Sequence, residues 1–271
     1  MYITNRPEIA RIAEDAGVDW IFVDMEFIGK DSRQKGLDTV QNHHTVQDIC
    51  NIRNAVRKAK VLVRVNPVHE AIDGYFSSED EINATIEAGA DIIMLPYFKT
   101  VDEVRKFIGY VNGRAKTCLL VETPEAALLL DEILDVEGID MIHLGLNDLH
   151  LALGMKFMFE LLADGTVDRL SAKITAKGIP FGFGGIATLS GGALPGSMVL
   201  KEHYRLGSSM VIVSRSFCNT DKITDLVEVK HIFDSGIADI RRLEKEASAA
   251  SCYFSDNRAA VIDSVRNILK K

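Results

Sequence analysis

The sequence contains no hydrophobic run long enough to cross a membrane. Its apolar stretches, such as residues 210–213, have the length of a strand, whereas a bilayer-spanning helix needs about 20 consecutive apolar residues. Residues 1–17 also lack a basic stretch followed by an apolar run, so we expect no secretion signal and a cytoplasmic protein. The composition therefore disfavours both a membrane protein and a secreted one.

Two further absences narrow the function. The 31 Lys and Arg residues are outnumbered by 39 Asp and Glu, giving a net charge of -8, so nucleic-acid binding is disfavoured. The four cysteines are far apart in the sequence and form no CxxC pair: Cys50, Cys118, Cys218 and Cys252. This spacing suits neither a disulfide framework nor a zinc knuckle.

Short apolar runs alternate with amphipathic stretches along most of the chain. The predicted strands are 2–4, 20–24, 61–65, 91–95, 117–121, 141–144, 180–183 and 210–213. The predicted helices between them are 7–16, 46–58, 79–88, 101–111, 125–134, 167–177 and 197–205. This alternation is typical of βαβ units and predicts an α/β fold.

The number of repeats predicts a TIM (β/α)8 barrel. Several helices end in a glycine shortly before the next strand, as at Gly17 and Gly89, where glycine supplies a left-handed C-cap. A GxGxxG motif, expected early in a doubly wound nucleotide-binding sheet, is missing. We predict one domain over residues 1–271. Its helices 220–231, 237–250 and 257–270 form a C-terminal extension, residues 219–271, that contacts another subunit of a homo-oligomer.

Ionisable residues stand at the ends of several predicted strands, where barrel enzymes carry their active sites. They are Asp24 and Glu26 after the second strand, Arg64 in the third, Glu122 after the fifth and Asp148 after the sixth. Each alone has a plainer interpretation as a helix cap or a surface ion pair. Together they would face one mouth of the barrel, and this convergence favours a site.

The residue types at this mouth suggest a metal and an acidic substrate. Glu122 and Asp148 can share a divalent cation, and oxygen ligands favour Mg²⁺ or Mn²⁺, with Co²⁺ as a further candidate. Arg64 can hold a carboxylate through two hydrogen bonds of its planar guanidinium. A metal beside an arginine suits a 2-keto acid.

Six segments in this order resemble the HpcH/HpaI aldolase and citrate lyase family. They are AGVDWIFVDME at 16–26, VRV at 63–65, EAGADIIMLP at 87–96, VET at 121–123, EILDVEGID at 132–140 and LGLNDL at 144–149. The resemblance implies a TIM barrel with a C-terminal helix exchanged between subunits, in a dimer or a hexamer. It also implies a metal-dependent aldolase acting on pyruvate, with Glu122 and Asp148 as metal ligands and Arg64 at the pyruvate. Pro96 and Asn147, within the matched segments, are candidate substrate contacts.

The sequence departs from the family pattern at two places in the expected site. Phe27 stands where aldolases of the family have a histidine, and a polar insertion, residues 28–42, follows it. His44 begins a segment resembling the one that normally starts with that histidine, so we predict His44 as the base, with His43 as the alternative. Asp24 or Glu26 would orient the imidazole or a metal-bound water. Leu120 replaces a glutamine usual near the pyruvate, which predicts an altered pocket.

The sequence thus predicts an aldehyde-lyase that cleaves a 4-hydroxy-2-keto acid to pyruvate and an aldehyde, or forms it from them. The same residues allow two other interpretations of the function. One is an oxaloacetate decarboxylase or acyl-CoA lyase of the same superfamily, and the other is a non-catalytic barrel that binds a keto acid. Loops such as 28–42 would select the aldehyde.

Overall fold

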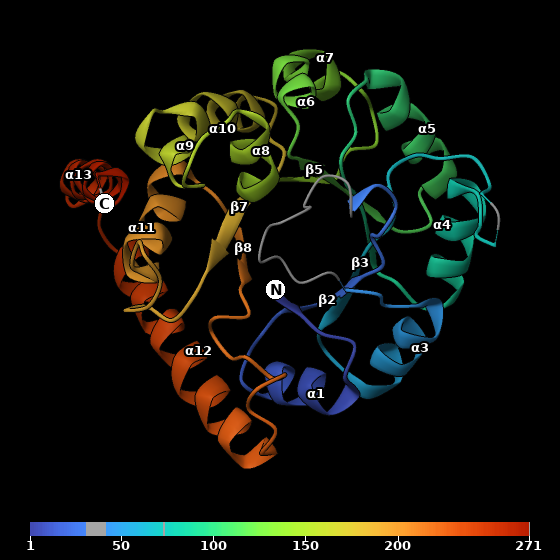
Figure 1. The fold of residues 1–271 in the computed structure, drawn as a ribbon, viewed down its shortest axis with the longest axis horizontal. Helices are drawn as coiled ribbons and strands as arrows, with labels where there is room; N and C mark the ends of the chain where they lie inside the picture. The colour runs from blue at the N-terminus through green and yellow to red at the C-terminus, as the bar shows by residue number, and fades with distance from the viewer. Residues whose placement is uncertain (31–41, 73, 271) are drawn as a thin grey trace.

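The chain folds into a closed barrel of parallel strands surrounded by helices (Figure 1). The computed structural model describes residues 1–30, 42–72 and 74–270. The strands are β1 Tyr2–Ile3, β2 Trp20–Asp24, β3 Lys60–Arg64, β4 Ile92–Leu95, β5 Lys116–Val121, β6 Met141–Leu144, β7 Phe181–Ile186 and β8 Met210–Val213. They pair in chain order, and β1 closes the barrel through Tyr2 opposite Val213 of β8. The predicted TIM barrel is confirmed.

Helices follow the strands around the outside of the barrel (Figure 1). They are α1 Pro7–Asp15, α3 Val46–Ala55, α4 Ser78–Glu87, α5 Val101–Val111, α6 Pro124–Leu128, α7 Leu130–Leu134, α8 Leu146–Ala152, α9 Glu160–Ala163, α10 Thr166–Ala176 and α11 Gly196–Leu206. Gly17 and Gly89 have φ of 100° and 103°, the left-handed conformation predicted for them at the helix ends. The single helix predicted over 125–134 is divided at Leu129 into α6 and α7.

Along each strand, side chains alternate between the barrel interior and the layer beneath the helices. This alternation determines which residues reach the site. Phe22 of β2 lies opposite Leu62 of β3, and both belong to the apolar cluster that fills the barrel. Side chains two residues apart in a strand share a face, so Asp24 and Arg64, also directly opposite, project to the same side one step nearer the carboxyl mouth. The register of two strands therefore brings together residues forty positions apart.

The C-terminal extension contains two long helices, not the three predicted. α12, Leu226–Ser248, runs without a break through Gly236, and α13 spans Phe254–Leu269. The gap predicted between 231 and 237 is helical, and a Cβ at Gly236 would lie 2.6 Å from Cε2 of Phe217, so the glycine permits close packing there. α12 begins later than predicted because the Asp225 side chain caps it by accepting the Val227 N–H.

The two long helices cover one side of the barrel (Figure 1). α12 packs against α1 and α11, and α13 packs against α9 and α11 of the same chain. None of the helices in the described part of the chain is both long and apolar enough to span a membrane.

Candidate active site

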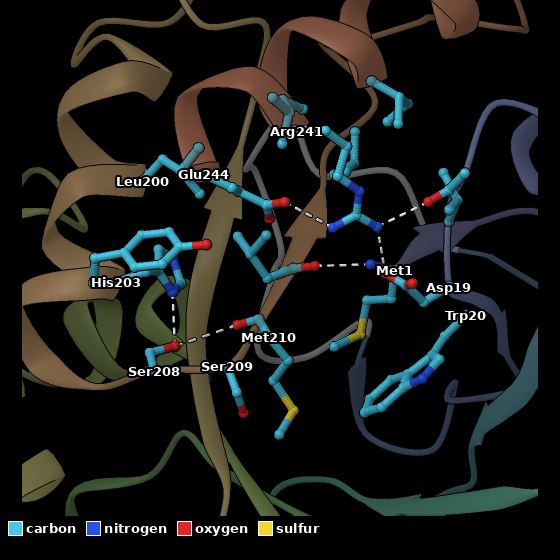
Figure 2. Close-up of a pocket in the computed structure, with 17 residues that line it drawn as sticks. Met1, Asp19, Trp20, Leu200, His203, Ser208, Ser209, Met210, Arg241 and Glu244 are labelled. Atoms are coloured by element: carbon cyan, nitrogen blue, oxygen red, sulfur yellow. Dashed lines mark hydrogen bonds and ion pairs between the residues drawn. The ribbon is translucent and has the colours of Figure 1, made fainter. Parts of the chain in front are cut away.

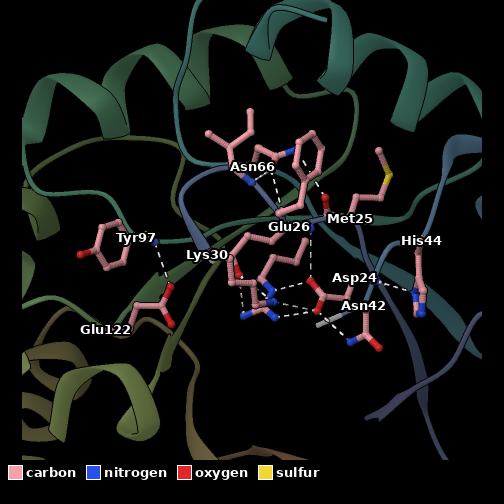
Figure 3. Close-up of polar contacts among 12 residues, drawn as sticks. Asp24, Met25, Glu26, Lys30, Asn42, His44, Asn66, Tyr97 and Glu122 are labelled. Atoms are coloured by element: carbon pink, nitrogen blue, oxygen red, sulfur yellow. Dashed lines mark hydrogen bonds and ion pairs between the residues drawn. The ribbon is translucent and has the colours of Figure 1, made fainter. Parts of the chain in front are cut away.

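Asp24 and Arg64 form the centre of a buried charged cluster at the carboxyl mouth. Figure 3 shows Glu26, Lys30 and Asn42 around Asp24. Arg64 Nε lies 2.8 Å from Asp24 Oδ1 and Nη2 lies 2.8 Å from Oδ2, a two-pronged ion pair. Arg64 Nη1 is also 3.3 Å from Oε2 of Glu26. The guanidinium expected to hold a substrate carboxylate thus holds carboxylates of the protein itself.

Burial and charge act against each other in this cluster. Burial by itself raises the pKa of Asp24, but the positive charges of Arg64 and Lys30 outweigh it and hold this pKa well below its usual range. Burial lowers the pKa of Arg64, and the charges of Asp24 and Glu26 reverse this and raise it well above its usual value. Both residues of the pair are therefore charged at neutral pH.

Lys30 completes the cluster and was missed by the sequence analysis. Its ammonium lies 3.3 Å from Asp24 Oδ2 and 3.3 Å from Glu26 Oε2. Its side chain is only 5% exposed, an unusual position for a lysine. The signal in the sequence was a lysine four residues after Glu26, inside the insertion at 28–42. Of that insertion, 31–41 lie outside the described residues, while Asn42 donates to Asp24 Oδ2 at 2.9 Å.

A second polar network fixes the chain just after Glu26. Asn66 Oδ1 accepts the backbone N–H groups of Phe27 and Ile28, each at 2.9 Å. Asn66 Nδ2 donates to the buried Glu81 at 2.8 Å, and the Tyr75 hydroxyl donates to the same carboxylate at 2.9 Å. These bonds hold the start of the insertion over the mouth, a role for Asn66 and Glu81 that the sequence analysis did not find.

Glu122 and Asp148 meet at the mouth as predicted. Burial, the charges of Glu26 and Asp148 and a hydrogen bond with Asp148 raise the pKa of Glu122 well above its usual value. Glu122 Oε1 accepts the backbone N–H of Tyr97 at 3.0 Å, which is turned toward it by a left-handed φ of 48°. A non-glycine residue with this φ is uncommon and is found at functional sites more often than elsewhere.

Gly145 leaves the room that Glu122 occupies. A Cβ at Gly145 would lie 2.6 Å from Cβ and 2.9 Å from Oε2 of Glu122. Asp148 reaches the same place from the first turn of α8, where it is half-buried. The end of β5 and the start of α8 thus form a cradle for two carboxyl groups. If both were ionised they would repel each other, and a bound cation would relieve that repulsion.

The donor set fits a hard divalent cation held by few protein ligands. Among the residues that the structure describes, no three His, Cys, Asp or Glu side chains form a ready-made metal-binding group. Glu122 and Asp148 could contribute two oxygen ligands, with the other positions left to water and substrate. Oxygen ligation of this kind suits Mg²⁺ or Mn²⁺.

His44 lies beside Asp24 but contacts its backbone. Its Nδ1 accepts the Asp24 N–H at 2.9 Å, and in Figure 3 it lies on the other side of Asp24 from Glu122. Burial lowers the pKa of His44, so the ring is neutral and, with Nδ1 accepting, carries its hydrogen on Nε2. In this arrangement His44 can accept a proton only after Nδ1 leaves the Asp24 N–H. His43, the alternative base, is exposed.

The remaining candidates are placed differently from one another. Pro96 is buried between β4 and Tyr97, next to the site. Asn147 is exposed on α8, beside Asp148. Leu120 is buried in the barrel interior below Glu122, where it makes the floor of the site apolar. The substrate contacts assigned to Pro96 and Asn147 stay predictions.

Two cavities lie outside this cluster. One, about 490 Å³, is lined by His43, His44 and apolar side chains such as Phe27. The other, about 620 Å³, lies at the amino end of the barrel, where Arg241 of α12 donates to Asp19 at 2.6 Å (Figure 2). Although this second cavity is larger, barrel enzymes carry out their chemistry at the opposite, carboxyl end.

The fold and the charged mouth define a TIM barrel with the architecture of a barrel enzyme. Residues 2–162 match the family model described as HpcH/HpaI aldolase/citrate lyase, so the chain belongs to that family. This membership confirms the resemblance seen in the sequence.

Comparisons with individual proteins also point to this family. A 2-keto-3-deoxy-L-rhamnonate aldolase of Escherichia coli O1:K1 / APEC is 27% identical over 176 residues, covering 54% of this chain and 58% of the relative. The match thus spans little more than half the length of that relative. An HpcH/HpaI aldolase from Desulfitobacterium hafniense DCB-2 has a TM-score of 0.60 at 17% identity, covering 84% of this chain and 91% of the other. A family protein from Burkholderia cenocepacia J2315 has a TM-score of 0.62 at 16% identity, covering 85% and 94%. At these identities the two structures support the fold.

Proposed function

We propose that this protein is a divalent-metal-dependent carbon–carbon lyase. It would cleave a 4-hydroxy-2-keto acid to pyruvate and an aldehyde, or join these two in the reverse reaction. The observation that carries the proposal is the buried Glu122, whose pKa is raised by burial and by the nearby carboxylates of Glu26 and Asp148. Membership of the family and the aldolase name of its relatives support the same reaction class.

The metal would be held by Glu122 and Asp148, with Mg²⁺ or Mn²⁺ favoured and Co²⁺ a further candidate. A divalent cation there would supply a Lewis acid that draws electrons from the keto group of the substrate. The chain supplies the apolar floor at Leu120, which lowers the local dielectric and strengthens charge interactions at the mouth.

Arg64 would orient the keto acid by binding its carboxylate with the fork that now holds Asp24. Pro96 and Asn147 would border the substrate. His44 would move the proton of the hydroxyl group that becomes the aldehyde, once Nδ1 has left the Asp24 N–H. Because the lowered pKa keeps the ring neutral, a released His44 is in the protonation state that a base requires.

The test is the exchange of pyruvate methyl protons in heavy water, followed by NMR with and without Mg²⁺ or Mn²⁺. We expect exchange that needs the metal and that disappears in Glu122→Gln, which keeps the size of the side chain but removes its charge. Glu125→Gln, an exposed glutamate at the start of α6, is the matched control and should exchange at the wild-type rate. Metal-independent exchange, or full exchange in Glu122→Gln, would refute the proposal.

A second candidate follows from the position of His44. Loss of CO₂ from oxaloacetate needs no base for an alcohol, so a site in which Nδ1 is already engaged is suited to it. Incubation with oxaloacetate and metal, with pyruvate formation compared between wild type and Glu122→Gln, tests this reaction. Binding of keto acid without exchange or cleavage would instead support a non-catalytic barrel, and an acyl-CoA lyase would require turnover of a CoA thioester.

We also propose a homo-oligomer, a dimer or a hexamer, in which α12 and α13 contribute to the contact. Analytical ultracentrifugation at several protein concentrations measures the assembly directly. A monomer at all concentrations would contradict this part of the proposal.

A further inference from the structure

Two cations in the mouth share the same carboxylate oxygens. Arg64 Nη2 lies 2.8 Å from Asp24 Oδ2, and Arg64 Nη1 lies 3.3 Å from Glu26 Oε2. The Lys30 ammonium lies 3.3 Å from each of these two oxygens (Figure 3). Lys30 therefore duplicates two of the contacts that Arg64 makes, and the third contact of Arg64, through Nε, goes to Asp24 Oδ1.

This duplication matters because the carboxylates are buried. The side chains of Asp24 and Glu26 are each 1% exposed, so water cannot replace a cation that leaves them. A buried charge that loses its partner is strongly unfavourable. Asn42 donates to Asp24 Oδ2, but an amide carries no charge, so Arg64 turns to a substrate at a lower cost when another cation stays with Asp24 and Glu26.

We propose that Lys30 is a positioning residue that keeps Asp24 and Glu26 neutralised while Arg64 binds the carboxylate of the substrate. The inference rests on the proposed function, which assigns the substrate carboxylate to Arg64. Without Lys30 the two protein carboxylates hold Arg64 more tightly, and an anionic substrate must compete with them for it. The loss falls on substrate affinity more than on the rate of the bound complex.

The first experiment compares Lys30→Met with the wild type in the metal-dependent exchange of pyruvate methyl protons, at varied pyruvate concentration. The KM for pyruvate should rise about tenfold or more, as expected for a lost charged contact, and kcat should change much less. Lys116→Met is the matched control, because Lys116 is an exposed lysine that pairs with Asp140 at the amino end of the barrel. Lys30→Arg, which keeps the charge, should retain most of the affinity.

The second experiment separates charge from packing. Lys30→Ala is assayed with added propylammonium and, in parallel, with propanol of similar size. Propylammonium should restore the affinity for pyruvate and propanol should not, whereas a residue that only fills space would respond to both or to neither. Thermal unfolding of each variant reports whether it is folded, and Lys30→Gln takes the place of Lys30→Met if the latter is not.

The outcomes distinguish this inference from the proposed function. Wild-type exchange with an unchanged KM in Lys30→Met, or equal rescue by propanol, overturns the role of Lys30 alone. If the wild type shows no metal-dependent exchange, the proposed function fails. In that case pyruvate binding to the wild type and to Lys30→Met is measured by saturation-transfer NMR. Equal binding to both proteins, or binding to neither, overturns the role of Lys30.

Discussion

The backbone N–H of Asp24 donates to Nδ1 of His44 at 2.9 Å. This hydrogen bond replaces one that a longer β1 would make with β2. β1 ends at Ile3, and Thr4 makes the last bond toward β2 by donating to the carbonyl of Phe22. The next N–H of β2 on that side belongs to Asp24, and His44 accepts it. The imidazole therefore completes the barrel where its first strand is too short.

This contact predicts that two variants of His44 behave differently. The amide oxygen of His44→Asn can accept the Asp24 N–H, so the free energy of unfolding should stay within about 0.5 kcal/mol of wild type. His44→Ala leaves that N–H unpaired and should cost about 1–3 kcal/mol. If His44 also transfers the proton, both variants lose lyase activity. Urea unfolding measures the first effect and turnover the second, and equal stability of the two variants would contradict the structural role.

Gly145 should not tolerate a side chain. Gly145→Ala places a Cβ 2.6 Å from Cβ of Glu122, and the strain should cost about 1–3 kcal/mol of stability. Displacing Glu122 should also weaken Mn²⁺ binding by about tenfold or more, as loss of a supporting contact does at other metal sites. Calorimetric titration with Mn²⁺ measures this. The control is Gly109→Ala in α5, where a Cβ meets nothing within 4 Å, and it should bind Mn²⁺ like the wild type.

The stability of the protein should fall as the pH is lowered from about 6.5 toward 4, in part because of His143. Burial lowers the pKa of His143 from its ordinary value of 6.5 to about 4. In this window the unfolded chain binds a proton that the folded protein does not, so the free energy of unfolding rises with pH, by up to about 1.4 kcal/mol per pH unit.

The variant His143→Gln isolates this contribution. Its amide can still donate to the carbonyl of Gly184, which lies 3.1 Å from Nε2 of His143. Urea unfolding between pH 5 and 6.5 should show a shallower pH dependence than in the wild type. His231→Gln, at an exposed position of α12, should leave the slope unchanged. A slope that is the same in all three proteins would show that His143 is not the titrating group.

Asn257 should help to fasten α13 to α11. Its Nδ2 donates to the carbonyl of Met198 at 3.1 Å and to the buried Glu202 at 2.8 Å, both in α11. Asn257→Ala should cost about 1–3 kcal/mol by leaving Glu202 short of a partner. Hydrogen exchange should become faster in α13 and not in β2–β4. Asn51→Ala, at an exposed position of α3, should change neither stability nor exchange.

Much of the fold could be predicted from the sequence because the determining patterns are local. Apolar runs of strand length, helical periodicity and glycines such as Gly17 and Gly89 each act within a few residues, and all eight predicted strands are present. The prediction was wrong between 231 and 237, where two helices were expected and α12 is continuous. At Gly236 the helix packs closely against the ring of Phe217, a contact that no local pattern shows.

The candidate site likewise contains residues that local patterns predict and contacts that they do not. The local sequence was enough to place Asp24, Arg64, Glu122 and Asp148 at or shortly after strand ends, and a parallel barrel must bring such ends to one mouth. Three contacts became visible in the folded chain alone: Asp24 holds Arg64, Lys30 lies between Asp24 and Glu26, and His44 accepts a backbone N–H. Those contacts depend on strand register and on the path of the chain after β2, which are set by packing between distant segments and not by any local pattern.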